Sequence, residues 1–155
     1  MHKSLIITAA FFGGLAVALG AFGAHGLEKI TTDEKILHGF QTGVQYQMYH
    51  ALGLLGIGIL ADKYNNGWIS WAGRSFIAGI ILFSGSLYLL TFLKIENSDA
   101  VKFIGPVTPF GGLFLIAGWI FLLLAILMQE KQEIYYFFQE SVQEIQKTIQ
   151  YQDWN

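Results

Sequence analysis

The sequence predicts an all-α membrane protein: a bundle of four transmembrane helices followed by a C-terminal amphipathic helix. Four apolar runs predict the bundle, at residues 5–22, 46–61, 71–93 and 110–128. A helix needs about 20 mostly apolar residues to cross the hydrocarbon layer of a bilayer, and none of these runs contains Asp or Glu. The chain of 155 residues is 54% hydrophobic and 13% charged, whereas soluble domains carry about 25% charged residues. So few charges cannot cover a water-exposed globule.

Four runs and their loops use most of the chain. We therefore expect one four-span membrane domain over residues 1–128 and a polar amphipathic tail over residues 129–155. The first run is longer than the apolar core of a cleaved signal, about 7–15 residues, so we expect it to be retained as a span. Lys and Arg are scattered over the loops and give the positive-inside rule little asymmetry. We expect a multi-pass protein of the inner (plasma) membrane with both termini cytoplasmic, since the long tail would otherwise have to be translocated.

Small residues predict where the helices approach one another. Glycine and alanine spaced four apart let helix backbones come close in lipid, where apolar burial gives no driving force between helices. The first run is rich in such residues, and others interrupt the third run and open the fourth. The predicted helix-packing residues are Gly13, Gly14, Ala18, Gly20, Gly85, Gly111 and Gly112.

Two helix starts are predicted from capping patterns. Thr31 with Glu34 three residues later forms a capping box, so a helix is expected to begin there and run into the second span. Thr108 followed by Pro109 predicts the start of the fourth span, with Thr as N-cap and Pro at the first helical position.

Polar side chains within the apolar runs are the candidate binding residues, because polar groups in lipid are expensive. The candidates are His25, Gln45, Tyr46, His50, Ser84, Ser86 and Thr108. Tyr46 and His50 lie one helical turn apart, where such a pair relays a proton or holds a ligand, or else joins two helices. Ser84 and Ser86 bend a helix by bonding to its backbone, or else line a polar cavity.

No catalytic centre is expected. The chain has no Cys, which excludes thiolate zinc sites and cysteine nucleophiles. His38 and His50 are twelve residues apart and therefore roughly 120° apart around a helix, so they do not share a face. The sequence contains no recognisable nucleophile–base pair, acid dyad or phosphate-binding motif. We expect no metal, no cofactor, no nucleic-acid partner and no enzymatic activity.

The tail has a periodic apolar pattern. Its apolar residues step by four, four, three and four, which is one face of a helix; they are Ile134, Phe138, Val142, Ile145 and Ile149. The tail is too polar to span a membrane, so an amphipathic helix on the membrane or against a partner is expected. A loosely ordered, solvated tail is the alternative.

Four separated segments form a recognisable set of motifs. They are GAFGAHGL at residues 20–27, FQTGVQYQMYH at 40–50, FSGSLY at 83–88, and GPVTPFGG at 105–112 with Gly118-Trp119. Together they resemble the DUF423 family of small four-helix membrane proteins. The resemblance extends over about residues 5–128. It implies a four-span inner-membrane protein of unassigned function, without established catalytic or binding residues. Members of this family usually end soon after the fourth span, so the tail is a departure.

These features favour a non-enzymatic scaffold or accessory subunit of a larger membrane complex. Its partners would be the lipid bilayer and other membrane subunits or further copies of itself. Two alternatives stay open. One is a small oligomeric transporter or channel. The other is a lipid- or quinone-binding protein whose site is formed by His25, Tyr46, His50 and Thr108.

Overall fold

The computed structural model describes residues 2–64 and 66–152, and every regular element in this part of the chain is helical. In chain order the elements are α1 (His2–His25), η1 (Leu27–Lys29), α2 (Glu34–Leu60), α3 (Gly67–Gly79), η2 (Ile80–Ser84), α4 (Gly85–Ile95), α5 (Val101–Ile104) and α6 (Val107–Gln152). The π-helical segment η2 joins α3 and α4 into one continuous helix over Gly67–Ile95. The predicted all-α fold is confirmed.

Three helical stretches in the described residues are long and apolar enough to cross a membrane. They are Lys3–Lys29, Gly67–Ile95 and Val101–Lys147. The predicted run at residues 46–61 covers the second half of α2 and its C-cap, Ala61. α2 also carries the polar residues Gln45, Gln47 and His50, and it is not among the three. Large apolar side chains cover the outside of the molecule, as on Ile7 and Leu113. Water would not tolerate so extensive an apolar surface, whereas lipid does.

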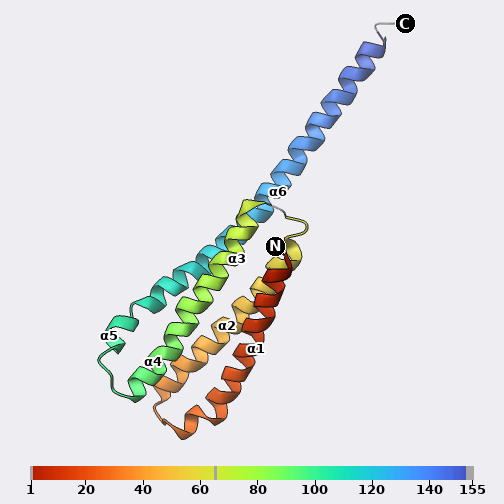
Figure 1. Ribbon diagram of the computed structural model, residues 1–155. Helices are drawn as coiled ribbons and strands as arrows, with labels where there is room; N and C mark the ends of the chain where they lie inside the picture. Colours follow the sequence, from red (N-terminus) through yellow and green to blue (C-terminus); the bar gives the residue numbers. More distant parts are fainter. Residues whose placement is uncertain (1, 65, 153–155) are drawn as a thin grey trace.

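The long helices lie side by side (Figure 1). Short links reverse the chain between α1 and α2 and between α2 and α3, and α5 lies in the longer link from α4 to α6. α1 packs mainly against α2, and α6 packs mainly against α3.

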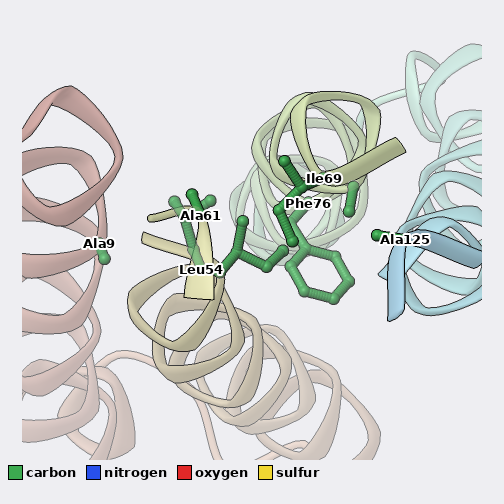
Figure 2. Packing of buried hydrophobic residues seen from close by; sticks show 8 residues of the cluster. Ala9, Leu54, Ala61, Ile69, Phe76 and Ala125 are labelled. Carbon is green, nitrogen blue, oxygen red and sulfur yellow. The ribbon is translucent and has the colours of Figure 1, made fainter. Parts of the chain in front are cut away.

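The buried core combines alanines and larger aliphatic side chains with one aromatic ring. The core cluster draws residues from α1, α2, α3 and α6, and Figure 2 shows it; its members are Ala9, Leu54, Ile57, Ala61, Ile69, Ala72, Phe76 and Ala125. Phe76 is fully buried and lies between two glycines on different helices. A Cβ on Gly53 of α2 would stand 2.9 Å from the Phe76 ring, and a Cβ on Gly118 of α6 would overlap that ring. The two glycines therefore make room for Phe76 at the centre of the bundle.

Both predicted helix starts are wrong by about two residues. The N-cap of α2 is Asp33, whose carboxylate accepts hydrogen bonds from the backbone N–H groups of Lys35 and Ile36. The Thr31 hydroxyl instead accepts a bond from the Asp33 backbone N–H. α6 begins at Val107, so Thr108 lies inside its first turn. A carboxylate caps an N-terminus at least as well as a hydroxyl, which explains the shift to Asp33.

The π-helical segment η2 ends at Ser84, immediately before Gly85 and Ser86. The Ser86 hydroxyl donates to the Phe83 carbonyl (2.9 Å), three residues earlier. α6 passes very close to this segment, because a Cβ on Gly111 would overlap the backbone nitrogen of Phe83. A π-helical turn inside an α-helix is a local distortion that often accompanies functional or strained positions.

α6 continues past the bundle without interruption. The Asn66 side chain caps α3 and also donates to the Ala125 carbonyl of α6 (2.8 Å), which ties the two helices at this end. Beyond Met128 the helix runs on to Gln152 and projects away from the other helices (Figure 1). We call residues 129–152 the α6 extension. The predicted tail helix is thus a continuation of the last apolar helix, and residues 153–155 lie outside the described part.

Candidate functional site

Gln47 joins three helices in the interior. Its side chain is 2% exposed. The Gln47 amide nitrogen donates to the Phe12 carbonyl of α1 (2.9 Å), and its amide oxygen accepts from the Tyr88 hydroxyl of α4 (2.9 Å). A Cβ on Gly43, one turn earlier, would stand 2.9 Å from the Tyr88 ring. Glycine at this position therefore allows the Tyr88 ring to pack against the backbone of α2. This arrangement satisfies polar groups that lipid could not satisfy.

His50 is held by α2 itself and by α6. Its ring is 6% exposed. Its Nδ1 lies 2.7 Å from the Tyr46 carbonyl oxygen, and its Nε2 accepts a hydrogen bond from the Trp119 indole N–H (3.2 Å). A neutral imidazole with its proton on Nδ1 satisfies both contacts. The ring also meets Phe76 edge-on, with 5.2 Å between ring centroids.

An aromatic groove opens beside His50, between α2, η2 and α6. Its volume is about 510 Å³. The lining residues are Tyr46, Tyr49, His50, Phe83, Gly112, Leu115, Ile116 and Trp119. Tyr49 and Trp119 are half exposed or more at its rim, whereas His50 is buried in its wall. The groove is therefore mostly apolar, with a few polar atoms on aromatic rings, which is typical of sites for flat or chain-like apolar molecules.

A second polar contact joins α4 to the start of α6. The hydroxyls of Ser86 and Thr108 lie 2.7 Å apart. Ser84, two residues earlier, is 1% exposed, and its hydroxyl has no hydrogen-bond partner in the part of the chain that the structure describes. The Ser86–Thr108 pair therefore fastens helices together, and Ser84 contributes no such bond.

The predicted polar residues separate into different places. Tyr46 and His50 line the aromatic groove, and Ser86 meets Thr108. Gln45 is exposed on the outer side of α2. His25 ends α1, next to the start of α2, whereas His50 lies 16 residues into α2, roughly 24 Å further along. His25 thus does not join the groove, and the predicted site of His25, Tyr46, His50 and Thr108 is not assembled.

Three residues at the site were absent from the list of predicted candidates, although the motifs quoted from the sequence contain them: Gln47, Tyr88 and Trp119. The spacing of buried positions along α2 offered a signal for Gln47, because Phe40, Gly43, Gln47 and His50 recur every three or four residues on one face. Tyr88 and Trp119 carry no such signal, since their partners come from other helices.

The predicted packing residues differ in how closely another helix approaches them. Gly111 makes the closest helix approach among them, and a Cβ on Gly20 or Gly112 would find an ordinary neighbour at 3.4 or 3.7 Å. A Cβ on Gly13, Gly14 or Gly85 would find no atom within 4 Å. Ala18 is exposed. Several tight contacts instead involve glycines outside the prediction: Gly43, Gly53, Gly58, Gly79 and Gly118.

The polar contacts of the interior join helices to one another, and the groove beside them is mostly apolar. Among the described residues no group of three or more His, Cys, Asp or Glu side chains is placed to hold a metal ion. The polar side chains of the interior bond mainly to backbone carbonyls or to one another. Such bonds are the means by which membrane helices are held together.

The helical fold and the apolar outer surface define an integral membrane protein. The family described as "Protein of unknown function (DUF423)" matches residues 19–112. The UPF0382 membrane protein YwdK of Bacillus subtilis is 48% identical over 124 residues, which are 79% of this chain and 95% of the relative. The UPF0382 inner membrane protein YgdD of Escherichia coli is 35% identical over 132 residues, 85% of this chain and 95% of the relative.

This chain belongs to the DUF423 family, as its motifs predicted. No solved structure matches it. The alignment to the Bacillus subtilis relative takes in nearly all of that protein but leaves about a fifth of this chain unmatched. The names of the relatives place them in a membrane, and in the Escherichia coli case in the inner membrane.

Proposed function

We propose that this chain is a four-span, non-enzymatic membrane protein that acts as a scaffold or accessory subunit of a larger complex. The observation that carries the proposal is the exposed apolar face of the α6 extension. Ile134, Phe138 and Ile145 are each more than half exposed there, outside the bundle. Contiguous exposed apolar surface of this kind is typical of a surface that meets another protein or a membrane.

The position of α2 supports a fourth span. Its 27 residues make a helix of roughly 40 Å, and it packs against α1, α3 and α4. The two polar groups that would be most costly in lipid, on Gln47 and His50, are buried and hydrogen-bonded. Four spans would put both ends of the chain on one side, and we assign that side to the cytoplasm of a multi-pass inner-membrane protein.

The interior supports a structural role over a catalytic one. Gln47, Tyr88, His50 and Trp119 bond within the bundle. Catalysis by acid–base chemistry needs a group within reach of a substrate proton, and both ring nitrogens of His50 are already engaged.

Native mass spectrometry tests the proposal. The untagged chain is extracted from its own membrane in a mild detergent and compared with a chain that stops after Met128. We expect the full chain in an assembly with other subunits or further copies of itself, and the shortened chain without the contacts that the exposed apolar face makes. A full chain that extracts free of other subunits contradicts the accessory role.

The aromatic groove favours a second candidate function, the binding of a lipid chain or a quinone ring. Its lining combines three aromatic residues, Tyr46, Phe83 and Trp119, with one small residue, Gly112. A Gly112→Val substitution adds volume to the groove, so a bound molecule should be lost. The test is solvent extraction of the purified protein and identification of copurifying molecules. If the wild-type protein and the Gly112→Val variant yield the same molecules in equal amounts, the groove does not bind them, which contradicts this function.

A further inference from the structure

The α6 extension begins at the aqueous edge of the bundle. The link between α2 and α3 carries Asp62 and Lys63, and Asn66 in the same link bonds to the Ala125 carbonyl of α6. Charged residues mark the level at which a helix leaves the bilayer, so the chain beyond Met128 lies outside the apolar layer. At 1.5 Å per residue the extension reaches roughly 36 Å, and it continues along the line of α6 (Figure 1).

One stripe of the extension repeats with the period of a coiled coil. Its residues are spaced three, four, three and four apart, and we call them the seam: Tyr135, Phe138, Val142, Ile145 and Ile149. All five side chains are exposed, from 40% for Val142 to 70% for Phe138. Alternating spacing of three and four is the a/d pattern that buries a seam against a second helix. β-Branched residues occupy two a positions, Val142 and Ile149.

Charge is sorted away from the seam. From residue 132 onward every charged residue of the extension lies on the opposite side of the helix, at Glu133, Glu140, Glu144 and Lys147. The positions that flank the seam hold uncharged residues, which include Gln139, Ser141 and Gln146. Over residues 132–152 two copies of this helix can therefore meet along the seam without bringing like charges together. Lys131, seven residues before Phe138, limits the seam at its N-terminal end.

The same charges disfavour a helix that lies on the membrane. Helices of that kind carry Lys and Arg on their polar face, and anionic lipid attracts them. The extension carries four Glu and two Lys. Pairing with a different protein helix is commonly selected by charges at the flanking positions, and this seam has none there.

We propose that the α6 extension pairs with the extension of a second copy of this chain in a parallel coiled coil. The pairing is parallel because both extensions leave the same face of the membrane, around a twofold axis normal to it. Each seam residue then meets its own counterpart. This inference rests on the proposed role of the extension as an interaction surface, and it names the partner.

Disulfide cross-linking in native membranes tests the pairing, because the chain contains no Cys of its own. Ile145→Cys places a thiol in the seam, and the matched control Lys147→Cys places one on the charged side. A disulfide requires Cα atoms about 4.4–6.8 Å apart. On mild oxidation we expect a dimer of this chain for Ile145→Cys, at least about tenfold more abundant than for Lys147→Cys. Adding Val142→Asp to Ile145→Cys should abolish that dimer while the bundle keeps its thermal stability in detergent.

Three results would overturn the proposal. One is equal or absent cross-linking at the two positions. Another is a cross-link from residue 145 to a protein of a different mass, which leaves the accessory role standing. The third is a residue-145 thiol that neither cross-links nor reacts with a water-soluble maleimide, which indicates a helix buried in the membrane surface. Conversely, a cross-linked dimer that copurifies with no other subunit supports the pairing and contradicts the accessory role.

Discussion

At the scale of single residues, Gln47 connects more of the bundle than any of the polar residues that the sequence singled out. Its two hydrogen bonds reach α1 and α4. The sequence did predict three neighbouring polar candidates in this part of the chain, Gln45, Tyr46 and His50. It did not show that Gln47 is buried and Gln45 exposed, because the helices that pack against α2 decide which of its faces is buried.

Gln47→Leu should destabilise the bundle by about 1–2 kcal/mol, since the Tyr88 hydroxyl and the Phe12 carbonyl lose their shared partner. Gln45→Leu is the matched control, two residues earlier and exposed. Unfolding of the purified protein in increasing sodium dodecyl sulfate measures both. If the two variants unfold at the same sodium dodecyl sulfate concentration, the hydrogen bonds of Gln47 contribute nothing to the stability of the bundle.

Sequence spacing predicted one neighbour of His50 but not its hydrogen-bond donor on α6. The pairing of Tyr46 and His50 on one turn was predicted, and the two rings stack at 5.9 Å between centroids. The hydrogen bond to His50 Nε2 comes instead from Trp119, 69 residues later. A single sequence contains no signal for a contact of that kind, because it forms only when α6 packs against α3 and brings Trp119 to His50.

At the scale of helices, the closest approach between α6 and η2 depends on Gly111. A Cβ there would overlap the backbone of Phe83, and backbone cannot move aside as a side chain can. Gly111 was predicted as a packing residue from its place at the start of the last span. Its partner, the π-helical segment, was not predicted, although Ser84, Gly85 and Ser86 at its C-terminal end indicated a bend in the helix.

Gly111→Ala should lower the stability of the bundle by about 1–3 kcal/mol or more, because α6 must separate from η2 to admit the methyl group. Gly112→Ala is the control, since a Cβ there meets the Phe83 ring at an ordinary 3.7 Å. Thermal unfolding in detergent, followed by the loss of monodisperse protein in size-exclusion chromatography, compares the two. A Gly112 variant at least as unstable as the Gly111 variant would refute this account of the contact.

At the scale of the whole molecule, the sequence predicted the membrane class, the helical fold and the family, all of which are confirmed. Long apolar runs make these features predictable, because lipid admits few alternatives to a helix. The sequence also marked a polar tail with an apolar face. It did not predict that the tail continues the last apolar helix. The composition changes at Gln129, but this change alone does not show whether the helix ends there, and no helix-breaking residue marks an end.

The central claim is that four spans bring both ends of the chain, and with them the α6 extension, to one side of the membrane. Single cysteines at exposed positions test it by labelling intact cells and inverted vesicles with an impermeant maleimide. Glu28→Cys and Asp99→Cys lie at one end of the bundle, and Lys63→Cys and Glu140→Cys belong to the other. We predict that the first pair labels from one side only and the second pair from the opposite side. Labelling of residues 28 and 63 from the same side would show that α2 does not cross the membrane, and would contradict the account.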